Sequence, residues 1–162
     1  MRIIKLFILL THHTGVPFYL IKKITFLLEK TINSILSKYT SIKVKIKNEN
    51  KETSIKIFND KYTNGLNARM LCGSEIFLVE LAFRIAFQSL SNISKPNFFI
   101  CDEGWSCLDE KKISKLNVIL KTINEYNDYM LTVSHIKSVK KWINSNIHIT
   151  IDNNGYRNIT IN

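Results

Sequence analysis

The chain contains little cysteine, and this shortage limits the chemistry that its thiols can support. Three cysteines occur among 162 residues, at Cys72, Cys101 and Cys107. The number is odd, and no pair has the spacing of a metal site with His or Cys partners nearby. Such usage favours a reducing compartment, and therefore an intracellular protein of the cytoplasm or nucleus. Cys101 lies within an apolar run, where a thiol acts as a small core side chain.

Acidic residues are scarce relative to basic ones. The chain has 23 Lys and Arg against 13 Asp and Glu, which gives a net charge of +10 and a pI near 9.6. A positive excess favours polyanions, such as nucleic acids or nucleotides, as partners. The lysines are spread along a chain that is also rich in Asn and Ile, so a general compositional bias is the alternative explanation.

A hydrophobic run long enough to span a bilayer is not evident. Arg2 and Lys5 precede the apolar run 6–10, which superficially resembles a signal peptide. This run is too short to cross a membrane, lacks a small-residue cleavage site and is followed by the polar residues 12–14. We expect it to be a core segment, and we expect no membrane partner.

The length suffices for one domain with a sizeable core, and neither repeats nor a low-complexity linker divide it. Residues 15–17 predict a turn, and the spacing of apolar residues predicts a long amphipathic helix over 20–36. Alternation over 42–47 and 54–57 predicts a hairpin with one apolar and one Lys-rich face. Lysines there would serve solubility and edge protection or, alternatively, contact DNA. Residues 59–70 are polar.

The second half alternates predicted helices and strands, which is typical of an α/β fold. Predicted helices cover 74–90, 110–126 and 136–143. Predicted strands cover 98–101 and 129–133, and a terminal β-hairpin covers 147–161, with its turn at Asn154-Gly155. The strand at 98–101 is a continuous apolar run opened by Pro96. We therefore expect it to be buried on both faces of a sheet flanked by helices.

Asp102 and Glu103 directly follow this apolar strand. A buried strand delivers its next residues to the carboxyl edge of the sheet, where open α/β folds bind ligands. Two acids there are costly unless a cation or a water network uses them. Mg²⁺ on a nucleotide phosphate is the fitting partner, and the second acid can then orient an attacking water. The alternative is a strand that ends in a solvated acidic loop.

Three further features lie at the ends of predicted elements. The sequence Leu-Cys-Gly-Ser-Glu at 71–75 opens a helix, so its backbone N–H groups can bind an anion, or it is an ordinary helix cap. Asp109 ends the loop 106–109 and can simply cap the following helix. His135 follows a strand, where an imidazole can reach a terminal phosphate or is an ordinary surface or core residue. Together with the acid pair, these features follow one another at the ends of successive predicted elements. This joint pattern indicates a ligand-binding site more specifically than any one feature does.

In this order, the features resemble the C-terminal half of an ABC-type ATPase head. The matching segments are the signature motif at 71–75, the Walker B strand at 98–103, the D-loop at 106–109 and the H-loop at 133–135. Gly104-Trp105 resembles the Gly-Phe of SMC-like DNA-repair ATPases of the SbcC type, whereas membrane transporters typically have Pro-Thr there. Residues 15–20, Gly-Val-Pro-Phe-Tyr-Leu, resemble the segment where the coiled coil of those ATPases re-enters the head. The resemblance covers about residues 1–161.

The resemblance implies a role for each matching position. Asp102 would hold Mg²⁺, usually through water, and Glu103 would orient or deprotonate the attacking water. His135 would contact the γ-phosphate of ATP in the same head. The signature turn would face ATP bound on a second, opposing head, and it comprises Cys72, Gly73, Ser74 and Glu75. The D-loop would couple the two sites across the head dimer, and it comprises Ser106 and Asp109.

Two substitutions and one absence depart from the family pattern. Cys72 replaces a serine whose hydroxyl contacts the γ-phosphate, and a thiol is a weaker donor. Ser74 replaces a glycine where phosphate approaches closely. The phosphate-cradling motif Gly-x-x-x-x-Gly-Lys-Ser/Thr does not occur in the sequence. We therefore expect a fragment or a split protein that needs an N-terminal half carrying this loop.

The resemblance predicts a single domain over 1–162, with a re-entry segment, helix and hairpin at 1–70 and the motif core at 71–162. It implies ATP binding and hydrolysis in DNA double-strand-break repair or DNA-end processing, with activity only in the completed head. Expected partners are the N-terminal half or a second head, a nuclease subunit and DNA. The alternatives are a catalytically degenerate lobe that binds a partner or DNA and, less favoured, a transporter nucleotide-binding domain.

Overall fold

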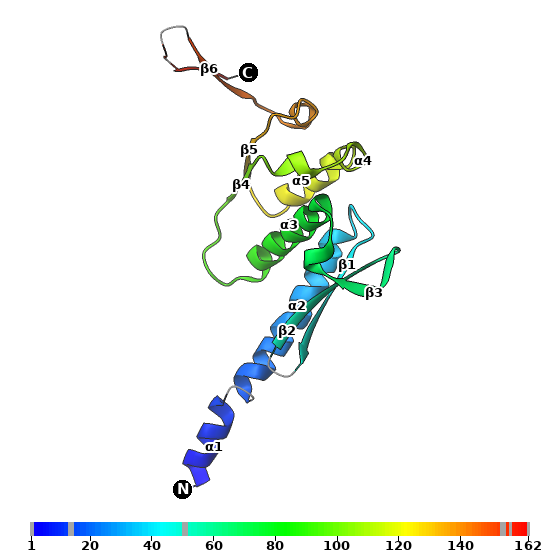
Figure 1. Cartoon of the computed structure of the whole chain (residues 1–162). Helices are drawn as coiled ribbons and strands as arrows, with labels where there is room; N and C mark the ends of the chain where they lie inside the picture. The colour runs from blue at the N-terminus through cyan, green and yellow to red at the C-terminus, as the bar shows by residue number, and fades with distance from the viewer. Residues whose placement is uncertain (1, 13–14, 50–51, 153–154, 156, 162) are drawn as a thin grey trace. The chain divides into compact units, whose positions relative to one another are not determined.

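The structure is a computed structural model that describes residues 2–12, 15–49, 52–152, 155 and 157–161 (Figure 1). The chain divides into two compact units, residues 1–96 and 97–162. The boundary follows Pro96 rather than residue 70, because helix α3 (Gly73–Leu90) packs on helix α2 (Val16–Leu36) within the first unit. A single domain over 1–162 stays a prediction.

Helix α2 is the long amphipathic helix that the sequence predicts. It begins directly after Gly15 with proline in its first turn, where the fixed φ of proline suits a helix start. In its C-terminal half the buried side chains recur at helical spacing, at Leu28, Ile32, Ile35 and Leu36. Helix α3 packs against α2 and also matches the predicted helix over 74–90. The two helices together provide most of the apolar core of the first unit.

An antiparallel sheet follows α2, in the order β1 (Lys43–Glu49), β2 (Glu52–Asn59) and β3 (Tyr62–Asn67). Its first two strands confirm the predicted hairpin, with Val44 paired to Ile57 on the buried face. The sequence missed β3 and the 3-10 helix η1 (Ala68–Met70), because this polar stretch lacks apolar alternation. Gly65 makes β3 possible: its φ is +77°, and a Cβ atom there would lie 2.7 Å from the Phe58 ring.

The polar side of α2 covers the outer edge of this sheet. Asn33 Nδ2 donates to the carbonyl of Val44, and Asn33 Oδ1 accepts from the Val44 N–H, both at 2.8 Å. Glu29 Oε2 accepts from the N–H of Ile46 at 2.7 Å. Among the described residues β1 pairs with β2 alone, so these backbone groups face no partner strand on that side. Helix α2 therefore uses its polar face, as well as its apolar face, to hold the first unit together.

Helix α1 (Arg2–Thr11) is exposed, so the expectation that residues 6–10 form a core segment is wrong. Its large apolar side chains from Ile3 to Leu10 are 45–83% exposed, because little of the described chain packs against them. By length and composition alone, the segment Ile3–Leu36, which contains α1 and α2, is apolar enough to cross a membrane, whereas the sequence predicts no segment of that kind. The first turns of α2 are also exposed and apolar, so they extend the exposed apolar surface of α1. Core helices of soluble proteins and signal sequences also reach this length and hydropathy, so the segment does not show where the protein is located.

The second unit is built on a parallel pair of strands, β4 (Phe98–Asp102) and β5 (Tyr129–Val133). The elements between them are η2 (Gly104–Cys107), α4 (Glu110–Ile113) and α5 (Leu116–Asn124). This strand–helix–strand arrangement confirms the predicted α/β organisation. The helix expected over 110–126 is instead two helices. Lys115 leaves helical geometry, with φ −91° and ψ 3°, so that α5 starts at the fully buried Leu116.

The chain ends in the predicted β-hairpin. Strand β6 (Ile147–Ile151) pairs antiparallel with β7 (Arg157–Ile161). Gly155, in the turn between them, has a φ of +83°, whereas Asn154 of the predicted turn lies outside the described residues. The short helix expected over 136–143 is a 3-10 helix, η3 (Val139–Trp142).

The β4–β5 pair is covered on one face and exposed on the other, so the expectation that β4 is buried on both faces is wrong. Cys101 is buried, and its partner Thr132 is half-buried. The opposite face exposes five large apolar side chains by 49–72%, at Phe98, Ile100, Tyr129, Leu131 and Val133. The reason is the size of the sheet, since β5 is the sole strand paired with β4 in the part of the chain that the structure describes.

Candidate functional site

Glu103 stands where β4 ends and the backbone turns sharply. Its φ of 52° and ψ of 6° place it in the left-handed region, which costs a residue with a Cβ atom roughly 1–2 kcal/mol. Hydrogen bonds hold this conformation on both sides. The Glu103 N–H donates to the carbonyl of Val133 at 2.9 Å, and its carbonyl accepts from the N–H and Oγ of Ser106, at 3.1 and 2.7 Å. A strained backbone held in this way aims the Glu103 carboxylate in a fixed direction.

The structure brings Glu103 and His135 together, two residues that the sequence identified as candidates. His135 Nε2 lies 3.0 Å from Glu103 Oε1. The turn after β5 presents the imidazole, because the Ser134 hydroxyl accepts from the N–H of Ile136 at 3.1 Å. The His135 side chain is 93% exposed and that of Glu103 is 40% exposed, so both are open to a ligand. A carboxylate able to accept a proton thus lies beside an imidazole able to donate one.

Asp102 is exposed at the end of β4, opposite Val133 and on the open face of the strand pair. No group of three or more His, Cys, Asp or Glu side chains suited to a metal ion occurs within the described residues. Asp102 and Glu103 therefore do not fit a metal cage made of protein alone. They do fit Mg²⁺ that arrives with a nucleotide, since that ion takes one or two carboxylates and fills its other positions with phosphate oxygens and water.

The loop after Glu103 holds the two residues predicted to form a D-loop. Ser106 supports the Glu103 turn through its two hydrogen bonds to the Glu103 carbonyl. Asp109 Oδ1 accepts from the backbone N–H of Lys112 at 2.8 Å, and Asp109 Oδ2 lies 3.3 Å from Lys112 Nζ. Asp109 therefore caps α4, which confirms the structural alternative for this residue. Its coupling across a head dimer stays a prediction.

The predicted signature turn lies in the first unit, at the start of α3. Glu75 Oε2 accepts from the N–H of Cys72 at 3.3 Å, and Cys72 Sγ lies 3.3 Å from Ser74 Oγ. Ser74 is buried, whereas none of the described residues has an atom within 4 Å of a Cβ atom added to Gly73. The turn is thus an ordered helix cap with an open approach to its glycine. Its contact with a nucleotide on an opposing head stays a prediction.

Trp105 and Thr132 belong to the site, although the sequence did not identify their contact. Trp105 is fully buried, and its indole N–H donates to Thr132 Oγ1 at 2.5 Å. This bond joins the loop after Glu103 to the strand that leads to His135. A signal for it exists, because a buried indole N–H usually finds an acceptor. The sequence could not single out the acceptor, since many Ser, Thr and Asn side chains compete for that place.

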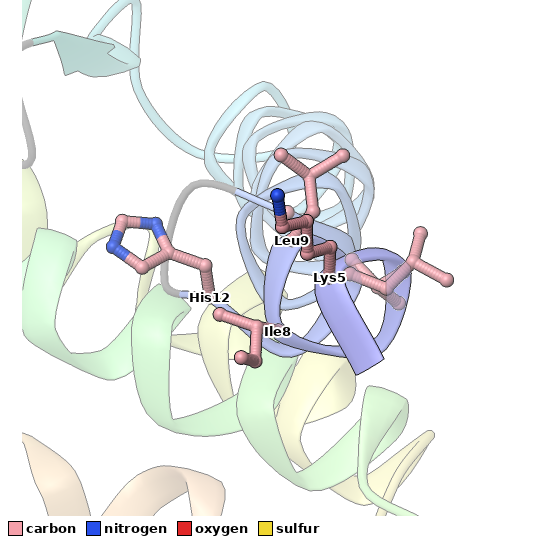
Figure 2. Close-up of a pocket in the computed structure, with 7 residues that line it drawn as sticks. Lys5, Ile8, Leu9 and His12 are labelled. Atoms are coloured by element: carbon pink, nitrogen blue, oxygen red, sulfur yellow. The ribbon is translucent and has the colours of Figure 1, made fainter. Parts of the chain in front are cut away.

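A separate cavity of about 650 Å³ lies where α1 meets α2 and contains no predicted site residue (Figure 2). Lys5, Ile8 and Leu9 of α1 contribute to its wall, with His12, Gly15 and Val16. Gly15 approaches α1 closely, because a Cβ atom there would lie 2.5 Å from the carbonyl oxygens of Leu9 and Leu10. The described part of this wall is mostly apolar and contains no arrangement of catalytic groups.

No family model matches the chain. Its sequence is 30% identical over 141 residues to the uncharacterized protein R555 of Acanthamoeba polyphaga mimivirus. The match covers 78% of this chain but 10% of the relative. The chain thus spans about a tenth of the length of this relative.

Several solved structures with similar folds are SMC ATPase heads. One structure, concerned with ATP-driven dimerization and DNA-stimulated activation of SMC ATPases, matches with a TM-score of 0.71, 14% identity and 88% coverage of both chains. The SMC head domain from Thermotoga maritima matches with a TM-score of 0.60 and 22% identity. This match covers 83% of this chain and 46% of the Thermotoga maritima chain. A Pyrococcus furiosus Smc head bound to the C-terminal domain of ScpA matches with a TM-score of 0.64 and 14% identity. This match covers 84% of this chain and 34% of the Smc head chain.

The chain has the fold of an SMC ATPase head. This result confirms the predicted fold class, a lobe of the P-loop ATPase type with helices and sheet. Within the SMC-head fold, Glu103 and His135 follow two adjacent parallel strands, which is the edge where α/β folds bind ligands. Likeness to the SbcC type in particular, and the C-terminal position within a head, stay predictions.

Proposed function

We propose that this chain is the C-terminal part of an SMC-like ATPase of the SbcC type, which uses ATP in DNA double-strand-break repair or DNA-end processing. The observation that carries the proposal is the contact of 3.0 Å between Glu103 and His135 at the strand ends of an SMC-head fold. It joins a candidate base for the attacking water with a candidate ligand of the γ-phosphate, on one edge of one sheet.

Each residue at this edge has a separate task in the proposed reaction. Glu103 accepts a hydrogen bond or a proton from the attacking water through its carboxylate oxygens. His135 Nε2, which faces Glu103 in this structure, donates to an oxygen of the γ-phosphate. Asp102 would hold Mg²⁺ that arrives with the nucleotide. When bound, that ion would neutralise charge on the phosphate oxygens.

A second segment must complete the site, because the sequence contains no Gly-x-x-x-x-Gly-Lys-Ser/Thr loop. The exposed face of the β4–β5 pair supports this requirement. Parallel sheets are normally covered on both faces, yet Phe98, Ile100 and Leu131 are more than half exposed. We assign this face to the N-terminal half of the head, which would supply the phosphate loop and its lysine. This chain alone is expected not to hydrolyse ATP.

Further partners follow from the fold and the charge. The signature turn at Cys72–Glu75 would contact ATP on a second head, in line with the SMC structure that concerns ATP-driven dimerization. DNA is a further partner, supported by the net charge of +10 and by the DNA-stimulated activation described for that protein. A nuclease subunit and an intracellular location complete the proposal. ScpA occupies the Pyrococcus furiosus head, so heads of this fold do accept protein partners.

The proposal is tested by reconstitution with the polypeptide from the same source that carries the phosphate loop. ATP hydrolysis is measured for each chain alone and for the mixture, with and without Mg²⁺. We expect hydrolysis in the mixture with Mg²⁺ only. We also expect Glu103→Gln to abolish hydrolysis while nucleotide-dependent association of heads persists. Normal turnover by Glu103→Gln would refute the role of Glu103.

A degenerate lobe that binds a partner or DNA without catalysis is the second candidate. Cys72 and Ser74 favour it, because the thiol already contacts the Ser74 hydroxyl at 3.3 Å and Ser74 is buried. These side chains leave less room and a weaker donor for a phosphate on an opposing head. Rapid hydrolysis in the reconstituted mixture would exclude this candidate. A transporter nucleotide-binding domain is disfavoured by Gly104-Trp105 and by residues 15–20.

A further inference from the structure

The indole of Trp105 is buried in the loop 104–108, where Leu108 is the other buried side chain. Trp105 is 0% exposed, whereas its neighbours Ser106 and Cys107 are exposed. The loop makes local hydrogen bonds, among them Cys107 Sγ to the carbonyl of Gly104 at 3.0 Å. Local bonds set the shape of a turn, but a loop is fixed on a scaffold by contacts with a distant element. Trp105 provides such a contact.

That distant element is the strand that presents His135. Thr132 lies on the half-buried face of β5, pairs with Cys101 of β4 and precedes the turn that carries the imidazole. Its hydroxyl accepts the indole N–H at 2.5 Å. The Trp105 side chain is two residues beyond Glu103. The bond therefore links the loop that follows Glu103 to the strand that precedes His135.

We propose that the Trp105–Thr132 hydrogen bond is the positioning element that keeps the Glu103 carboxylate against the His135 imidazole. Glu103 has an unfavourable left-handed backbone, so its conformation persists only while its surroundings hold it. The bonds to Val133 and from Ser106 hold the Glu103 backbone itself, and the anchored indole holds the loop in which Ser106 lies. Neither Trp105 nor Thr132 would touch the nucleotide. This inference rests on the proposed function where it concerns hydrolysis.

The first test follows the loop itself in the full chain, without nucleotide. Cys107 is an exposed thiol in this loop, and Cys101 is buried. In a Cys72→Ser background, the rate at which Cys107 reacts with a disulfide reagent reports how often the loop opens. Thr132→Val keeps the volume but removes the hydroxyl. We expect it to speed labelling about five-fold, the effect of losing one ordinary hydrogen bond.

Three variants separate positioning from general destabilisation. Thr132→Ser keeps the hydroxyl and should label like the parent. Trp105→Phe should speed labelling at least as much as Thr132→Val does, because it also leaves a cavity. Adding Thr132→Val to it should have less effect than Thr132→Val has alone, because the two residues share one bond. Thr122 is the matched control: it is buried in α5, and its hydroxyl donates to the carbonyl of Val118 at 2.9 Å. Thr122→Val should leave Cys107 labelling unchanged. Equal labelling of Thr132→Val and the parent would overturn the proposal.

The second test measures hydrolysis in the reconstituted mixture. Thr132→Val should lower kcat about five-fold or more, with little change in KM for ATP. Thr132→Ser, which keeps the hydroxyl, should have the kcat of the parent. Thr122→Val should change neither kcat nor KM. Faster labelling with an unchanged kcat would overturn the positioning of Glu103. If the unsubstituted mixture fails to hydrolyse ATP, the proposed function fails, while the labelling series still decides whether the bond holds the loop.

Discussion

Glu103 Oε1 lies 3.0 Å from His135 Nε2, although the two residues follow different strands. The parallel register of β4 and β5 explains the contact, because it aligns Asp102 with Val133 and so ends both strands at one level. The two turns then differ in form. Glu103 turns through a left-handed backbone, and Ser134 forms a hydroxyl-supported turn before Ile136. Each turn directs its side chain toward the other.

We expect Glu103 and His135 to act as one unit in hydrolysis. In the reconstituted head, Glu103→Gln and His135→Ala should each lower kcat by about 100-fold or more, and the double variant should be no more than a few-fold worse than the stronger single variant. Steady-state hydrolysis measures this. His148→Ala, in the terminal hairpin, is the control and should retain full activity. Losses that multiply in the double variant would contradict a shared task.

We expect Asn33 to be the main polar link between α2 and the sheet. Asn33→Ala removes both hydrogen bonds to Val44 and leaves its part-buried backbone groups without these partners. The free energy of unfolding should fall by about 2 kcal/mol, measured by urea denaturation. Lys30→Ala changes an exposed residue of the same helix and should stay within about 0.5 kcal/mol of the parent. Similar losses in the two variants would refute the link.

Tyr39 should make stability fall at alkaline pH. Burial raises the pKa of Tyr39 well above its usual value, and its hydroxyl donates to the carbonyl of Leu78 at 3.5 Å. Below about pH 10 both folded and unfolded states keep the proton, so the raised pKa has no effect. Above that pH the unfolded state loses the proton first, so stability falls as pH rises.

Tyr39→Phe should remove this part of the pH dependence. Urea denaturation at about pH 9, 10 and 11 should show a flatter decline for Tyr39→Phe than for the parent chain, since phenylalanine has no proton to lose. Tyr19→Phe replaces a tyrosine that is 68% exposed, and it should decline as the parent does. Parallel curves for all three proteins would show that Tyr39 is not responsible.

Asp109 allows its capping role to be separated from the predicted coupling of two heads. Asparagine is as good an N-cap as aspartate, so Asp109→Asn should change stability little, whereas Asp109→Ala should lose about 1 kcal/mol. If Asp109 also couples two heads through its charge, both variants should lower hydrolysis in the reconstituted dimer. If it serves as a cap alone, Asp109→Asn should hydrolyse ATP normally.

Local chemistry made the elements around the site predictable. The apolar run before Asp102 predicts β4, helical spacing predicts α2 and α3, and Asp109 at a helix start predicts its cap. These features depend on residues a few positions apart, which any window of sequence contains. Strand β3 was missed because Gly65 and its polar neighbours do not alternate, and the partner strand β2 supplies the hydrogen bonds that order them.

Sequence alone determined the α/β order, the identity of the acid pair and the absence of a phosphate loop. The tertiary structure decided that Glu103 meets His135, that Trp105 reaches Thr132, and that Asn33 caps a strand edge rather than facing water. It also decided that one face of β4 is open. The physical reason is the same in each case: strand register and helix packing join residues far apart in the chain, and no local pattern encodes that pairing.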